Sequence, residues 1–138
     1  MTRVLVIEAD ATTRVQLQAL LERDGFEPVV VGDADSAIEV LESGQAPALV
    51  VMGWGVPGAD GLEMLRWVRS RPACAGTWVL VLTGHSRRED EIAALDAGAD
   101  DYMVKPVHAA RLRAHLRAGA RRATRPGSRG DAPGRAAA

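Results

Sequence analysis

The sequence predicts an α/β fold, a doubly wound five-stranded parallel sheet with helices on both faces. Short apolar runs rich in Val, Ile and Leu alternate with segments in which apolar residues recur at helical spacing. A glycine or a proline follows each of the first four helical segments, where a helix is expected to end. The length of 138 residues suits one domain with a core of its own.

Five strands and five helices are expected in regular alternation. The strands are predicted over residues 3–7, 29–31, 48–52, 78–82 and 102–104. The helices are predicted over residues 12–23, 34–43, 60–70, 87–97 and 107–122. In open sheets of this kind, ligands bind beyond the carboxyl ends of the strands, so a functional site is expected there.

Charge is distributed unevenly along the chain. Residues 1–110 hold nine basic and seventeen acidic residues, whereas residues 111–138 hold eight basic residues and one acid. We expect a folded domain over residues 1–123 and a disordered Arg/Pro/Gly/Ala tail over residues 124–138. A basic tail either attracts nucleic acid or acidic surfaces or keeps the chain soluble. This tail has no aromatic residue to stack on a base, so we expect at most weak binding of nucleic acid through it.

The composition excludes several classes of protein. The single cysteine, Cys74, rules out an intrachain disulfide and a Cys-rich zinc site. No apolar run approaches the roughly 18 residues of a membrane span, and the first residues lack the layout of a signal peptide. We therefore expect a cytoplasmic protein that makes no membrane contact.

Four motifs, taken in order, resemble the receiver domain of bacterial two-component response regulators. They are VLVIEAD, VPGADGLEML, VLTG and AGADDYMVKP. The resemblance covers about residues 3–120 and implies a flavodoxin-like fold with strand order 2-1-3-4-5. It also implies a mechanism in which acids after the first strand and an aspartate ending the third strand hold Mg²⁺. That aspartate then accepts a phosphoryl group from a histidine kinase.

The residues that match this mechanism are incomplete. Glu8 matches the first acid, but Ala9 stands at the second acid position, with Asp10 beside it. Gly53 stands at the phosphoacceptor position. Residues 46–59 contain no Asp, Glu, Ser or Thr, so no small shift of the alignment restores an acceptor.

The supporting residues are present. By resemblance, Thr83 is the switch hydroxyl, Tyr102 is the switch aromatic, and Lys105, followed by Pro106, contacts the phosphoryl oxygens. Lys105 is the only lysine among the 17 basic residues. Mg²⁺ binding is predicted to be weak or absent and no other cofactor is expected, because both direct carboxylate ligands are missing. We expect Lys105 to pair with Glu8 or Asp10 instead.

The glycines after the third strand allow other interpretations. The run from Gly53 to Gly58 matches G-x-G-x-x-G, but the next strand ends in Thr83 and Gly84 rather than in an acid for ribose hydroxyls. Gly53 and Gly55 also leave space beside Trp54, which either a small molecule or a neighbour such as Trp54 itself fills. His85, His108 and His115 lack the partners of a catalytic or metal site.

We expect a binding module and not an enzyme. The function predicted is that of an atypical, phosphorylation-independent receiver in bacterial signal transduction or transcriptional regulation. The resemblance places protein contacts on roughly residues 86–120, and a homodimer is one arrangement left open. The alternatives are a small-molecule sensor that binds near Gly53, Trp54 and Gly55, and a regulator phosphorylated at a non-standard acceptor such as Thr83.

Overall fold

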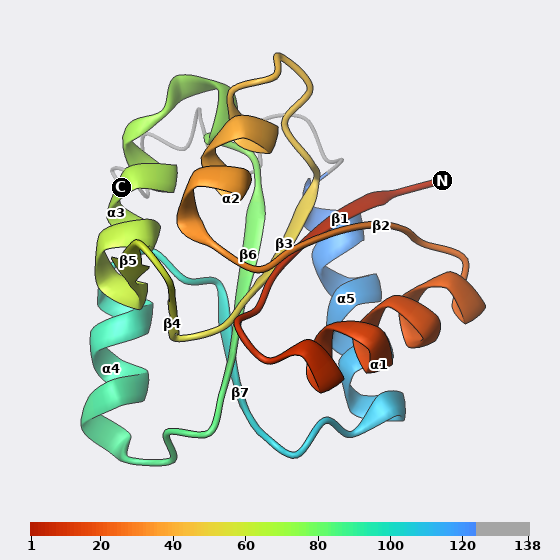
Figure 1. Ribbon diagram of the computed structural model, residues 1–138. Coiled ribbons are helices and arrows are strands. Elements are labelled where there is room, and N and C mark those ends of the chain that lie inside the picture. The colour runs from red at the N-terminus through yellow and green to blue at the C-terminus, as the bar shows by residue number, and fades with distance from the viewer. Residues whose placement is uncertain (124–138) are drawn as a thin grey trace.

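The computed structural model describes residues 1–123 (Figure 1). Its main sheet has five parallel strands in the order β2-β1-β3-β6-β7. These strands are β1 (Arg3–Ile7), β2 (Glu27–Val31), β3 (Leu49–Met52), β6 (Trp78–Thr83) and β7 (Asp101–Val104). The predicted order 2-1-3-4-5 is confirmed, since β6 and β7 are the fourth and fifth strands of this sheet.

Helices cover both faces of the sheet (Figure 1). One face carries α1 (Ala11–Arg23) and α5 (Ala109–Ala123), and the other carries α2 (Ala34–Leu41), α3 (Gly61–Ser70) and α4 (Arg88–Asp96). Side chains of each strand alternate between the two layers, as a strand period of two requires. Leu5 and Ile7 face the layer with three helices, whereas Val4 and Val6 face α1 and α5.

Some element boundaries differ from the prediction. Strand β2 begins earlier, at Glu27, and contains Pro28, which is tolerated because β2 lies at the edge of the sheet. Helix α2 ends earlier, at Leu41, because the chain turns before Gly44, which adopts a φ of +88°. A 3₁₀ turn at Pro72–Cys74 follows α3 and was not predicted.

A short hairpin precedes α3 and was also not predicted. It consists of β4 (Gly55–Val56) and β5 (Ala59–Asp60), joined by Pro57 and Gly58. Gly58 has a φ of +102°, and a proline followed by a glycine with positive φ is the pattern of a type II turn. The hairpin separates the end of β3 from the beginning of α3, so Gly53 does not lead directly into a helix.

Aspartates begin three helices. Asp10, Asp33 and Asp60 are the N-caps of α1, α2 and α3, and each carboxylate accepts a backbone N–H from the first turn. In α3 the cap is reciprocal, because the Glu63 side chain also accepts the N–H of Asp60. These caps fix where the loops at the carboxyl edge of the sheet pass into helices.

The predicted disordered tail, residues 124–138, lies outside the described residues. Of the helices within residues 1–123, none is long and apolar enough to cross a membrane.

Candidate functional site

An ion pair lies at the carboxyl edge of the sheet. Glu8 directly follows β1 and Lys105 directly follows β7, so the topology brings both side chains to this edge. Lys105 Nζ is 3.0 Å from Glu8 Oε1, and the two side chains are 28% and 6% exposed. Glu8 Oε2 accepts the backbone N–H of Asp10 at 3.0 Å. The predicted ion pair of Lys105 is confirmed, and its partner is Glu8.

Gly53 lies beside this ion pair. It directly follows β3, and its N–H donates to the Ile7 carbonyl at 2.7 Å. A Cβ atom on residue 53 would lie 3.2 Å from Glu8 Oε1 and 3.4 Å from the Ile7 carbonyl oxygen. The Glu8 carboxylate therefore lies next to the place where a side chain of residue 53 would begin.

Trp54 follows Gly53 and packs against the start of α3. Its ring lies over Gly61 at the start of α3, where a Cβ atom on residue 61 would be 2.4 Å from Trp54 Cε3. The side chain that lies against Gly53 is that of Glu8, which was not predicted. Trp54 instead packs the β4–β5 hairpin onto α3.

Asp10 faces α1 and not the ion pair. Its Oδ2 accepts the N–H of Thr13 at 2.8 Å and the Thr13 hydroxyl at 2.7 Å. These two hydrogen bonds lower the pKa of Asp10 below its ordinary value, and the charges of Lys105 and Arg14 act in the same direction. Asp10 is thus a helix cap close to the site, and its carboxylate is already engaged.

Arg14 has a role that was not predicted from the sequence. This residue lies in the first turns of α1, and its Nη1 donates to the carbonyl oxygens of Glu8 at 2.8 Å and of Ala9 at 2.9 Å. It therefore holds the loop that carries Glu8 and adds a second cation near the ion pair. The only signal in the sequence was a basic residue shortly after an acidic loop at a helix start.

Thr83 and Tyr102 both contact the loop after β6. Thr83 is buried, and its Oγ1 accepts the backbone N–H of His85 at 3.1 Å. The Tyr102 hydroxyl donates to the His85 carbonyl at 2.8 Å. Burial raises the pKa of Tyr102, with smaller contributions from Asp90 and Glu91. The two residues that resemble the switch pair therefore hold one loop, that of His85.

A backbone hydrogen bond connects this loop to the ion pair. The N–H of Lys105 donates to the Thr83 carbonyl at 2.7 Å. The ion pair joins Glu8 to Lys105, and the backbone hydrogen bond joins Lys105 to Thr83. The segment that leads into α4 begins directly after Thr83. Pro106 follows Lys105 and is exposed.

The donor set does not suit the Mg²⁺ ion that the resemblance implies. Mg²⁺ requires nearly octahedral oxygen ligands and is usually held by one or more carboxylates. Ala9 and Gly53 offer no carboxylate, Glu8 is paired with Lys105, and Asp10 accepts two hydrogen bonds from Thr13. Within residues 1–123, His, Cys, Asp and Glu side chains form no group of three that could hold a metal ion.

The histidines lie apart from this site and from one another. His115 pairs with Asp101 of β7, and His108 Nδ1 accepts the N–H of Arg111 at 3.3 Å. His85 is exposed, with Nδ1 3.7 Å from Asp90 Oδ2. These contacts position α5 and the loop after β6, and they leave no histidine beside Gly53.

The family model of the response regulator receiver domain matches residues 4–117. The chain is 35% identical over 120 residues to the phosphate regulon transcriptional regulatory protein PhoB of Klebsiella pneumoniae. It is 40% identical over 124 residues to the KDP operon transcriptional regulatory protein KdpE of Escherichia coli (strain K12). These matches cover 87% and 88% of this chain but 52% of each relative, so the chain spans about half the length of both.

Solved structures agree with this match. A response regulator receiver domain from Clostridium thermocellum has a TM-score of 0.80 and 26% identity, covering 88% of this chain and 96% of that one. A putative response regulator from Chloroflexus aurantiacus has a TM-score of 0.83 and 25% identity, covering 88% and 98%. Fold and sequence define a signal-receiving α/β domain. The chain belongs to the response regulator receiver domain family.

Proposed function

We propose that this receiver works without phosphoryl transfer, as a cytoplasmic protein-binding module in bacterial signal transduction or transcriptional regulation, and not as an enzyme. The observation that carries the proposal is the Glu8–Lys105 ion pair beside Gly53. Phosphoryl transfer requires a nucleophile, which is a carboxylate oxygen in the mechanism that the resemblance implies, and cations that neutralise the developing charge. Gly53 offers no oxygen, and the lysine that would contact the phosphoryl group is already paired with Glu8.

Neighbouring oxygens are poor substitutes for the missing acceptor. Glu8 is buried and paired, and Asp10 caps α1. The Thr83 hydroxyl is buried and accepts a hydrogen bond from His85. These contacts favour a receiver that has no phosphoacceptor over a receiver that is phosphorylated at Thr83.

The same contacts support a fixed arrangement of the partner surface. A phosphorylated receiver changes its surface because the phosphoryl group favours one of two states. Here the carboxylate of Glu8 is a permanent negative group at Lys105, and Lys105 is joined to Thr83 and its loop. We therefore infer that residues 86–120 are presented in one arrangement and that partners bind it directly.

The experiment is incubation with acetyl phosphate and Mg²⁺, followed by the intact mass of the protein. The wild-type chain is expected to gain no phosphoryl group. The double variant Ala9→Asp/Gly53→Asp supplies both missing carboxylates, and is expected to gain one. The backbone at residue 53 permits an aspartate, because Gly53 is not among the glycines with positive φ. The variant Ala9→Asn/Gly53→Asn is the control of equal size without the acids.

A stoichiometric phosphoryl group on the wild-type chain would contradict the proposal. Peptide mapping then decides between the alternatives, because a phosphorylated Thr83 would identify a non-standard acceptor. The rebuilt variant shows that the assay detects phosphorylation of this fold when a carboxylate is present.

A further inference from the structure

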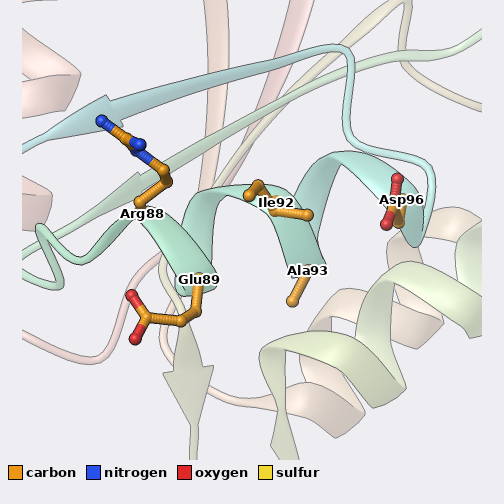
Figure 2. Close-up of a pocket in the computed structure, with 5 residues that line it drawn as sticks. All are labelled: Arg88, Glu89, Ile92, Ala93 and Asp96. Atoms are coloured by element: carbon orange, nitrogen blue, oxygen red, sulfur yellow. The ribbon is translucent and has the colours of Figure 1, made fainter.

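One face of helix α4 combines acids with exposed apolar side chains. Glu89 and Asp96 lie two turns apart on the same side of the helix. Figure 2 shows Ile92 and Ala93 between them, and these side chains line a shallow pocket together with Arg88. Ile92 is 50% exposed. We call Glu89, Ile92, Ala93 and Asp96 the α4 face, which has an apolar middle and an acid at each end.

The acids of the α4 face are weakly engaged. Glu89 Oε2 lies 3.4 Å from Arg87 Nη2, but the two side chains are 70% and 75% exposed, and such surface pairs stabilise little. Asp96 takes part in none of the ion pairs among residues 1–123. A basic segment can therefore bind this face without breaking a strong ion pair.

Helices α4 and α5 both end near the start of β6. Gly119, in the last turns of α5, lies against Trp78, because a Cβ atom on residue 119 would be 2.4 Å from Trp78 Cδ2. Shortly after α4, the N–H of Asp100 donates to the Val79 carbonyl at 2.8 Å. Trp78 and Val79 are consecutive residues of β6. The chain therefore leaves α5 at the edge of the sheet where α4 ends.

The segment that follows α5 has the length and the charge to reach the α4 face. Residues 124–138 number 15, which span up to about 50 Å when extended, whereas the nine residues of α4 are about 14 Å long. The segment contains three arginines and one acid. Helix α5 has five arginines and no acid, so it repels these arginines, whereas α4 has four acids and one arginine and attracts them.

We propose that residues 124–138 bind the α4 face of the same molecule. Arg129 and Arg135 then lie at its two acids, with Pro133 between them on the apolar side chains. A covalently linked segment is present at an effective concentration in the millimolar range, so a contact too weak between separate molecules still forms within one. The inference deepens the proposed function, on which it rests: α4 belongs to the surface over residues 86–120, so a protein partner must displace the segment to bind there.

The apolar side chains favour α4 over the other acidic helix of this layer. Helix α2 has exposed acids at Asp35 and Glu39. Within residues 1–123, the exposed large apolar side chains are those of Met1, Val15, Ile92, Leu95 and Val104. None of them belongs to α2, so the segment gains burial of apolar surface on α4 in addition to charge pairing.

The test places a nitroxide on the segment, at Ala137→Cys of the full chain, and records amide NMR signals without a phosphoryl donor. Cys74 is buried and therefore protected from the labelling reagent, which the unsubstituted chain treated in the same way checks. We expect the nitroxide to broaden the amide signals of residues 88–96 of α4 and to leave those of α2 unchanged. High salt is expected to reverse the broadening, because it screens the charges.

Two variants of the labelled chain reverse the charges, one on each side of the contact. Arg129→Glu/Arg135→Glu and Glu89→Arg/Asp96→Arg are each expected to restore the α4 signals, because like charges then meet. The chain that carries all four substitutions is expected to lose these signals again. The control Glu22→Arg/Glu39→Arg changes the charge by as much as the α4 variant, at exposed positions on α1 and α2, and is expected to behave like the parent chain. Circular dichroism checks that every variant is folded.

Three results would overturn the inference. The first is a labelled chain whose α4 signals are not broadened, and the second is a chain with all four substitutions that does not lose these signals again. The third is a mixture in which the nitroxide on one molecule broadens the α4 signals of an unlabelled molecule as strongly as its own, since the occupant is then a second copy. The proposed function fails differently, because uptake of a phosphoryl group by the wild-type chain would contradict it whether or not the segment binds α4.

Discussion

Glu8 is a carboxylate whose side chain is only 6% exposed, and its charge is balanced by Lys105 Nζ at 3.0 Å. A buried charge that loses its partner destabilises a protein by several kcal/mol, since it gives up hydration without compensation. The Arg14 side chain binds the loop that carries Glu8, but it donates to carbonyl oxygens of the backbone and not to the Glu8 carboxylate. At the scale of single residues, the site therefore depends on Lys105.

The substitution Lys105→Met is expected to lower the free energy of unfolding by about 2–3 kcal/mol, because it leaves Glu8 buried and unpaired. The double variant Glu8→Gln/Lys105→Met is expected to recover about half of this loss, because the remaining side chain carries no charge. Urea unfolding at pH 7 measures both. Lys105→Arg is the control that keeps the cation, and a Lys105→Met variant as stable as the wild type would contradict the role given to the ion pair.

The sequence predicted that Lys105 would pair with Glu8 or Asp10, but it could not decide between them. The decision depends on Thr13, whose N–H and hydroxyl both bind Asp10 and hold it at the start of α1. A helix cap is a local feature, so this preference had a signal in the sequence. The position of Arg14 had almost none, because its carbonyl partners are set by the path of the loop after β1.

At the scale of elements, acid caps control where three helices begin. Asp33 accepts the N–H of Ser36 at 2.7 Å, and hydrogen bonding to Ser36 lowers the pKa of Asp33. A pKa lowered by folding means that the stabilisation is complete above about pH 4 and is lost as the pH falls through the folded-state pKa. The stabilisation that these caps give to α1 and α2 is therefore lost at low pH.

Asp33→Asn tests this connection, because asparagine keeps the accepting oxygen of the cap but does not titrate in this range. We expect the wild type to be the more stable of the two at pH 7 and the difference to disappear as the pH falls through the lowered folded-state pKa of Asp33. Chemical unfolding at a series of pH values measures it. Asp35→Asn, which removes an exposed acid from the same turn, is the control substitution, and a stability difference for Asp33→Asn that is constant with pH would contradict the role given to the Asp33 cap.

The five strand–helix units could be predicted because the central strands β1, β3 and β6 are buried on both faces and apolar runs alternate regularly with helical segments. The β4–β5 hairpin could not, because two-residue strands have no periodicity to detect. Its turn residues, Pro57 and Gly58, were visible, but pairing of Gly55 with Asp60 depends on Trp54 packing against Gly61. That contact is a tertiary one.

On the scale of the whole molecule, Arg69 joins segments that are distant in the sequence. From α3, its guanidinium donates to the carbonyl oxygens of Gly98 at 2.9 Å and Thr77 at 2.8 Å, and it pairs with Asp100 at 2.8 Å. Asp100 Oδ2 also accepts the N–H of Val79 in β6. A single half-buried cation therefore connects α3, the start of β6 and the loop before β7.

Arg69→Met is expected to lower the free energy of unfolding by about 3 kcal/mol, since several half-buried oxygens lose their donor together. Arg66→Met, an exposed position on the same helix, should change it by less than about 0.5 kcal/mol. Unfolding followed by circular dichroism and by tryptophan fluorescence measures both. If Arg69 joins the segments as described, the unfolding transitions that the two probes measure coincide in the wild-type chain. An Arg69→Met variant as stable as Arg66→Met would contradict this role of Arg69.

Gly53 also has a consequence for how such a protein would be regulated over time. A regulator that carries a labile modification can be turned on and off many times during the life of one molecule. If this receiver works without phosphoryl transfer, as proposed, it has no such cycle, and its output would follow the number of copies in the cell. Control would then pass to synthesis and proteolysis, and the time needed to reset the signal would be the lifetime of the polypeptide itself.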